Sequence, residues 1–211
     1  MNKSAYLKSI LGALLVLLVL CVGLCSYAKW QAYRARRDAE LLILELHNLR
    51  VGESTPDDVN RITAHHRRYR VFLRGDTPVC KDTDELCYFD FSYENSLLAR
   101  LNLATIVRFG VRVLVYKRRV NGIIIGLQCG VRPNFFGIYL NEGLQPFTEL
   151  TPTQTLEISN VRQEITWVRL TPNAPERDRA YSLSLKCFDH IGRCHSKAEL
   201  LPSMASEVTV P

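Results

Sequence analysis

The sequence lacks the short motifs around which most common catalytic sites are built. It contains no Gly-x-Ser-x-Gly nucleophile elbow, no Gly-x4-Gly-Lys-Ser/Thr phosphate loop, no His-Glu-x-x-His metal pair and no Gly-x-Gly-x-x-Gly dinucleotide turn. These absences disfavour the enzyme families that such motifs define. We therefore expect a protein that does not catalyse a reaction.

The chain also lacks a strong excess of one charge, an internal repeat and any low-complexity tract. Its net charge is +6, and two of the positive charges, Lys3 and Lys8, lie at the N-terminus. A mildly basic surface of this kind does not predict nucleic-acid binding. We interpret the basic clusters at residues 67–70 and 117–119 as solvated surface or as contacts with lipid headgroups.

Charged residues are absent over the 19 residues from Ile10 to Ala28, which are mostly Leu and Val. As a helix at about 1.5 Å per residue, this run would extend roughly 28 Å, close to the ~30 Å hydrocarbon core of a bilayer. A short basic segment without acids precedes it, as in export signals and signal anchors. The sequence predicts that residues 10–28 contact the lipid bilayer, and that residues 1–28 form a cytoplasmic start and a transmembrane anchor.

The end of this run allows two fates for the anchor. Ser26 and Ala28 are small residues at the −3 and −1 positions of a possible cleavage site after Ala28. The run is, however, longer than the apolar part of a typical export signal, and Trp30 and Tyr33 follow it where aromatic side chains settle among headgroups. We favour an uncleaved, single-pass anchor, with cleavage as the alternative.

Flanking charge and cysteine usage give opposite indications of topology. Four basic residues at positions 29–37 outnumber Lys3 and Lys8, and the positive-inside rule alone would place the C-terminal side in the cytoplasm. Long domains cross the membrane largely regardless of such charges, and the later cysteines are spaced as in disulfide-bonded proteins. We predict that the domain lies outside the cytoplasm, on the periplasmic side of a bacterial inner membrane.

The remaining chain predicts an α+β fold built on a mostly antiparallel sheet with one or two helices. Residues 29–52 are expected to form a helical stalk with an apolar docking end at residues 41–46. Residues 53–202 form the extracytoplasmic domain, and residues 203–211 form a tail without regular structure. A capping Ser or Thr, Pro56 and the Asp pair at residues 57–58 predict a helix over residues 56–66.

Alternating apolar residues and turn signals predict the other elements. We expect a second helix over residues 97–109 and a loop over residues 145–155. Asn121-Gly122 is expected to form a type I′ turn, and Trp167 to lie in the core. The expected strands cover residues 69–74, 86–93, 112–120, 123–131, 134–140, 161–170 and 180–188.

Two segments resemble known envelope proteins. The stretch from Leu49 to Val59, Leu-Arg-Val-Gly-Glu-Ser-Thr-Pro-Asp-Asp-Val, resembles a helix start in small bacterial lipoproteins of the SmpA/OmlA type. The Leu-Gly-x-Pro expected after that helix is replaced by Ala-His-His-Arg at residues 64–67, and no partner or role is implied. The last two cysteines and Ala-Glu-Leu-Leu-Pro at residues 198–202 resemble uncharacterised bacterial single-pass envelope proteins, which imply no activity.

Seven cysteines are present, two of them within the apolar run. Cys80 and Cys87 share a six-residue spacer with Cys187 and Cys194, which predicts two local disulfides in an oxidising compartment, each contributing about 2–3 kcal/mol. Four cysteines permit three pairings, so the connectivity is open. We interpret Cys129, in an apolar run, as a buried free thiol, with a nucleophile as the alternative.

Zinc is the alternative for the C-terminal loop, where Cys187, His190, Cys194 and His195 offer four ligands within nine residues. Zinc sites usually draw their ligands from two distant pairs, and only the histidines at residues 65–66 could supply the second pair. The acidic residues at positions 82, 84 and 85 lack the Gly-centred pattern of a calcium loop. We therefore predict no metal and no cofactor.

Together these features favour a membrane-anchored extracytoplasmic protein that binds an envelope protein through a face or an edge of its sheet. No nucleic-acid partner is expected. The alternative is a thiol- or metal-dependent enzyme or redox protein whose centre is Cys129 or the loop from Cys187 to His195.

Overall fold

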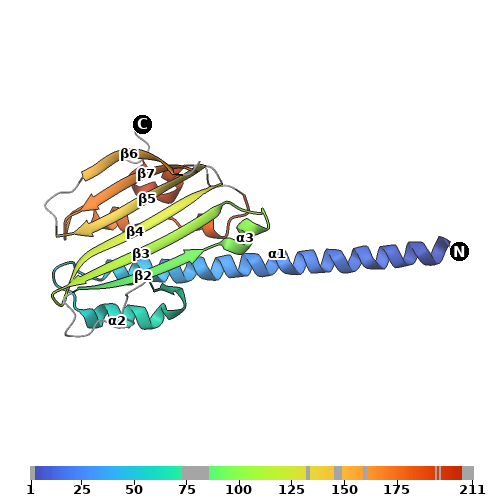
Figure 1. Ribbon diagram of the computed structural model, residues 1–211, viewed down its shortest axis with the longest axis horizontal. Coiled ribbons are helices and arrows are strands. Elements are labelled where there is room, and N and C mark those ends of the chain that lie inside the picture. The colour runs from blue at the N-terminus through green and yellow to red at the C-terminus, as the bar shows by residue number, and fades with distance from the viewer. Residues whose placement is uncertain are drawn as a thin grey trace.

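Helices lie against one face of a large sheet in this protein. The computed structural model describes residues 3–72, 86–131, 134–144, 149–158, 161–192, 194 and 196–205. Over these residues the sheet has seven strands in the order β1-β2-β3-β4-β5-β7-β6, and β5 and β7 are its one parallel pair. The α+β fold class is confirmed, and Figure 1 shows the arrangement.

The strands are β1 (Arg70–Val71), β2 (Leu86–Glu94), β3 (Ile106–Tyr116), β4 (Arg119–Val131), β5 (Asn134–Gly143), β6 (Glu149–Ile158) and β7 (Val161–Leu170). The α-helices are α1 (Lys3–His47), α2 (Pro56–His65), α3 (Ser96–Arg100), α4 (Arg177–Tyr181) and α5 (Lys197–Leu200). Short 3-10 turns cover Arg67–Tyr69, Lys186–Phe188 and Pro202–Met204.

Helix α1 runs without a break through both the apolar run and the expected stalk. Its part from Ile10 to His47 is long and apolar enough to cross a membrane, and the apolar stretch is not buried in the protein. Beyond the apolar stretch, the same helix buries one face in the domain, namely Ala28, Ala32, Ala35, Ala39, Leu42, Ile43 and Leu46. One continuous helix therefore joins the membrane-spanning candidate to the folded domain (Figure 1).

Burial alternates along β3, and this alternation defines the two faces of the sheet. Val107, Phe109 and Val113 are buried in the same core cluster as the apolar face of α1. The residues between them, such as Arg108 and Arg112, lie on the opposite face, which is more exposed. The period of two follows from the pleat of a strand. The helix-covered face thus holds the core, and the opposite face is the open face.

The predicted start of α2 is confirmed. The Asp58 carboxylate accepts hydrogen bonds from the backbone N–H of Thr55 at 2.8 Å and from its hydroxyl at 2.9 Å. The backbone hydrogen bond contributes most to lowering the pKa of Asp58. Val59 and Ile62 are buried, as their spacing predicted. Local capping chemistry was sufficient to predict this helix.

The helix expected over residues 97–109 is wrong beyond its first turns. Asn102 has a positive φ of 58°, and the N–H of Leu103 bonds the carbonyl of Leu98, which closes α3 as a Schellman motif. The chain then enters β3 at Ile106, where alternate side chains become buried against α1. This stretch is rich in β-branched residues and is buried within the sheet, so it forms a strand even though its apolar residues are also spaced as in a helix.

The Asn121-Gly122 turn is also wrong. The hairpin turns at Lys117 and Arg118, both with positive φ, and Asn121-Gly122 lie inside β4 next to a register shift. Val120 is fully buried and exchanges backbone hydrogen bonds with the loop after α1, which fixes its position. Tertiary pairing therefore overrides the local turn preference.

Three C-terminal expectations are corrected. Residues 180–188 are not a strand: α4 ends at Tyr181, residues 182–185 have no regular structure, and Lys186–Phe188 form a 3-10 turn, with Tyr181, Leu185 and Phe188 buried in the core. The loop expected over residues 145–155 contains the start of β6, which pairs with β7. The 3-10 turn at the expected tail buries Met204 in the core. Residues 145–148 and 206–211 lie outside the described residues.

The first strand is shorter than predicted. Residues 69–74 were expected to be extended, but Tyr69 ends a 3-10 turn and β1 covers Arg70–Val71, paired with β2. Residues 73 and 74 lie outside the described residues.

A buried ion pair holds the C-terminal end of α1 against the sheet. Arg177 donates from Nε to the Glu142 carboxylate at 2.8 Å, and its terminal nitrogens donate to the carbonyls of His47 and Leu49 at 2.7 and 2.8 Å. Tyr181 donates to the other Glu142 oxygen at 2.6 Å, and only 1 % of Glu142 is exposed. This arginine therefore satisfies helix-terminal carbonyls and a buried carboxylate together.

A polar cluster joins α1 to α2 and β2. His66 is buried, and its Nδ1 lies 2.8 Å from the Tyr93 hydroxyl while its Nε2 lies 3.3 Å from a Glu45 oxygen. Tyr69 stacks on Tyr93 and donates to Asp38 at 2.8 Å, and burial raises the pKa of Tyr69 to about 12. Burial lowers the pKa of His66 more than the nearby carboxylates raise it. The ring is thus held neutral in the folded state.

We predict that this histidine makes the protein less stable in mild acid. The unfolded chain, with a histidine pKa of about 6.5, binds a proton that folded His66 resists, so stability falls as the pH drops below about 6.5. The midpoint of thermal unfolding in detergent, measured across this range, should fall less steeply in His66→Gln. His65→Gln is the control, because His65 is exposed. An unchanged slope in His66→Gln would contradict the prediction.

Candidate functional site

The open face of the sheet carries a groove whose floor is glycine. Gly110 on β3 lies opposite Gly126 on β4, and Ser92 and Tyr139 flank the pair on the neighbouring strands. The groove has a volume of about 390 Å³. The Tyr139 ring packs over Gly126, where a Cβ would lie 2.8 Å from its Cε1, so the backbone is uncovered at Gly110. A Cβ at Gly110 would meet no atom closer than 3.9 Å, so this part of the floor is open.

Paired charges line the groove. Arg112 holds Asp90 with two hydrogen bonds of 2.7 and 3.3 Å, and Arg108 lies 2.9 Å from Glu94. Asp90 is largely buried, whereas both arginines are substantially exposed. Each pair joins β2 to β3, as cross-strand pairs of opposite charge do. The groove therefore combines an apolar floor with walls that offer polar groups but little net charge.

A second hollow continues the first along the same face. It has a volume of about 310 Å³, and its floor is the opposed pair Gly122 and Gly143. Ile124 lines both hollows, which makes them neighbours on the face. Leu144, at the far rim, is 56 % exposed. An open face with two adjoining apolar hollows is suited to an extended or ridged partner surface.

Trp167 was expected in the core, and the structure corrects this. It is half-buried on the open face, in register with Tyr139, and their rings lie 4.8 Å apart. The Tyr139 hydroxyl accepts a hydrogen bond from the Gln128 amide at 2.7 Å. Aromatic residues with a polar group are common at protein interfaces. The sequence offers no signal for this placement, because it depends on the β5–β7 pairing.

The predicted C-terminal disulfide is present. Cys187 and Cys194 are bonded, with Cα atoms 5.9 Å apart, and both are buried. Cys87 is also disulfide-bonded. Its expected partner Cys80 and the acidic residues at positions 82, 84 and 85 lie outside the described residues, so the Cys80–Cys87 pairing stays a prediction.

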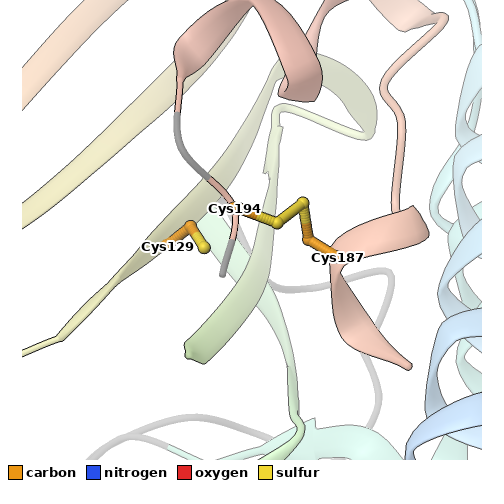
Figure 2. A group of neighbouring side chains, drawn as sticks. All are labelled: Cys129, Cys187 and Cys194. Carbon is orange, nitrogen blue, oxygen red and sulfur yellow. A yellow bond between two sulfur atoms is a disulfide. The ribbon is translucent and has the colours of Figure 1, made fainter. Parts of the chain in front are cut away.

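Cys129 is a buried free thiol, as expected, but it lies beside the disulfide. The three sulfur atoms of Cys129, Cys187 and Cys194 lie within 4.8 Å of one another (Figure 2). Thr105 Oγ1 is 3.3 Å from the Cys129 sulfur, and burial raises the pKa of this thiol. A thiol kept protonated is a weak nucleophile. With the disulfide formed, Cys129 provides the one thiol of this cluster.

The described histidines that were considered as zinc ligands lie in different parts of the structure and make different contacts. His65 and His66 both contact Glu45 on α1, at 2.9 and 3.3 Å. His190 lies in the C-terminal loop beside Gly192, and His195 lies outside the described residues. Among the described residues, the grouping that could hold a metal is the cysteine cluster. Two of its three sulfur atoms are joined in the Cys187–Cys194 disulfide, so Cys129 is the one cysteine of this cluster with a free sulfur.

We predict a specific labelling pattern for these cysteines. In an unreduced digest, Cys187 and Cys194 should appear as one crosslinked peptide, and Cys129 should be alkylated after unfolding but not in the native protein, because it is buried and its pKa is raised. The same digest tests the Cys80–Cys87 pair. Peptide mass spectrometry is the measurement. Alkylated Cys187 without prior reduction, or a crosslink that contains Cys129, would contradict the prediction.

Comparison with protein-family models, curated proteins and solved structures finds no match to this chain. Function must therefore be argued from the geometry.

Proposed function

We propose that this chain is a single-pass membrane protein whose extracytoplasmic domain binds an envelope protein through the grooved open face, without catalysing a reaction. The observation that carries the proposal is the groove itself, where Gly110 and the opposed pair Gly122 and Gly143 line two adjoining hollows on an exposed sheet face. A folded domain that fixes such a face on the end of an apolar helix is suited to hold a partner at a membrane.

Two features support an extracytoplasmic domain. The Cys187–Cys194 disulfide is typical of proteins in oxidising compartments. The basic cluster after the apolar run is partly used in folding, because Arg36 pairs with Glu40 at 2.8 Å and with Asp189 at 3.0 Å. Because Arg36 has this structural role, the basic cluster is weaker support for a cytoplasmic location under the positive-inside rule. Both sequence resemblances are to bacterial envelope proteins, which agrees with this placement.

A thiol- or metal-dependent activity at the cysteine cluster is the second candidate. It is favoured by the approach of three sulfur atoms within 4.8 Å. The raised pKa of Cys129 and the engagement of the other two sulfurs in a disulfide weigh against a resting nucleophile or thiolate ligand set.

Site-specific photocrosslinking in native membranes tests the proposed interface. A benzophenone amino acid at Ser92, exposed beside Gly110, should yield a discrete crosslinked protein. The same group at Asp57, exposed on α2, is the matched control on the other side of the molecule. A Gly110→Val change should abolish the Ser92 crosslink, because it adds a branched side chain to the groove at a position where a Cβ is accommodated.

The outcome against the interface is equally specific. If the crosslink forms equally from Asp57, or survives Gly110→Val in a protein that remains folded, the open face is not the binding surface. Folding of the variant is checked by circular dichroism.

A further inference from the structure

The end of the domain nearest the apolar run has a helix packed directly on α1. Ala28 and Ala32 are essentially fully buried and form a small cluster with Leu98 of α3. The partly buried side chains that complete this cluster are Leu97, Leu101, Leu103 and Ala104. Figure 1 shows α3 at the end of the domain from which α1 continues alone to the N-terminus. The domain thus begins where the apolar run ends.

The depth of this contact follows from helix geometry. Ala32 lies four residues after Ala28, a rise of about 6 Å along the helix axis. The polar headgroup zone on each side of a bilayer is roughly 5–8 Å thick. If residues 10–28 span the hydrocarbon core, α3 is therefore packed on α1 at the depth of the headgroups. The unbroken helix leaves no flexible segment that could hold the domain farther away.

The C-terminal disulfide loop shares this end of the domain. Gly192 donates its N–H to the carbonyl of Leu103 at 3.1 Å and accepts a hydrogen bond from the N–H of Thr105 at 3.2 Å. The neighbouring Ile191, within the loop closed by the disulfide, is 56 % exposed. An exposed isoleucine next to the α3 cluster is costly in water and favourable among headgroups and acyl chains.

The exposed side chains around this end are those that settle at a membrane surface. Trp30 and Tyr33 are exposed aromatic residues on α1. Exposed basic residues accompany them, namely Lys29, Arg34 and Arg37 on α1 and Arg100 at the end of α3. Aromatic rings favour the interface, and basic groups bind lipid phosphates. On α1 these side chains cover a rise of about 12 Å, from the end of the apolar run through the headgroup zone and just beyond it.

We infer that this end of the domain, formed by α3, residues 101–104 and Ile191, rests on the bilayer and contacts phospholipid headgroups. This inference relies on the proposed anchor at residues 10–28. It adds a second membrane contact, made by the folded domain itself, which fixes the domain relative to the membrane. The grooved face is then presented at a constant height and tilt to partners in the same membrane.

Depth-dependent fluorescence quenching in the full-length protein tests the inference. The protein is reconstituted in phosphatidylethanolamine and phosphatidylglycerol bilayers that contain a lipid with a headgroup nitroxide. Single-tryptophan variants are built on Trp30→Phe and Trp167→Phe, with Ile191→Trp as the probe. Leu144→Trp is the matched control, because Leu144 is equally exposed. It lies against Gly52, beyond the C-terminal end of α1, which extends about 28 Å past Ala28.

The expected result is several-fold stronger quenching of the Ile191→Trp variant than of the Leu144→Trp variant. A third variant that keeps only Trp30 reports the anchor. Strong quenching of Trp30 with equally weak quenching at positions 191 and 144 would overturn the domain contact but leave the anchor intact. Weak quenching of Trp30 would overturn the anchor and, with it, the inference.

Discussion

Replacing Arg177 with alanine is expected to cost about 3–5 kcal/mol of folding free energy, because it leaves the buried Glu142 carboxylate without its counter-charge. The change also removes the donors to the His47 and Leu49 carbonyls at the end of α1. Both losses act at the point where α1 ends against the sheet. We therefore expect the C-terminal part of α1 to exchange its amide hydrogens faster as well.

Two controls separate this effect from a general loss of charge. Arg61→Ala removes an exposed arginine paired with Asp58 and should cost no more than about 0.5 kcal/mol. In Arg177→Met combined with Glu142→Leu no buried charge is left unpaired, so much of the stability should return. Chemical unfolding in detergent gives the free energies. A cost for Arg177→Ala as small as that for Arg61→Ala would contradict the assigned role of the ion pair.

Leu42→Ala is expected to destabilise the domain by about 2–5 kcal/mol, the usual cost of emptying a fully buried leucine site. Leu42 belongs to the core cluster that also contains the buried strand residues. The prediction distinguishes a helix that is part of the core from a stalk that merely touches the domain.

Leu44→Ala is the matched control on the same helix, because Leu44 is 62 % exposed. It should change the free energy of unfolding by no more than about 0.5 kcal/mol. Equal effects of the two substitutions would mean that α1 does not pack as described. The inference that α1 holds the domain at a fixed height above the membrane would then fail.

Features encoded within a few neighbouring residues could be predicted from the sequence. The apolar run, the capped start of α2 and the paired spacing of Cys187 and Cys194 each depend on local chemistry, and the structure contains all three. The docking end predicted for residues 41–46 is confirmed in part, because Leu42, Ile43 and Leu46 are buried whereas Leu41 and Leu44 are exposed. The apolar run was sufficient to predict the membrane-spanning candidate, and the alternation along the expected strands was sufficient to predict the fold class.

Features that depend on strand pairing could not be predicted. Lys117 and Arg118 adopt the positive φ values of the hairpin turn, although Asn121-Gly122 has the stronger local preference. The buried Val120 and its hydrogen bonds to the loop after α1 fix the register instead. In the same way, no local pattern shows that residues 106–109 begin β3 instead of extending the helix α3.

The candidate site was the least predictable part. Gly110 lies opposite Gly126 only because β3 and β4 pair in one particular register, and a one-residue shift of β4 would move Gly126 to the core face. The approach of Cys129 to the disulfide similarly depends on how the C-terminal loop packs beneath the sheet. The sequence could suggest a sheet face as the contact surface, but not which residues would form it.

Topology of the full-length chain in a bacterial membrane is the most direct measurement. Alkaline phosphatase, which is active only where its disulfides form, is fused to the C-terminus, and green fluorescent protein is fused in a parallel strain. Anchoring by residues 10–28 with an extracytoplasmic domain predicts high phosphatase activity in the membrane fraction and no fluorescence. Inactive phosphatase with bright fluorescence, or release of the intact protein into the soluble fraction, would contradict it.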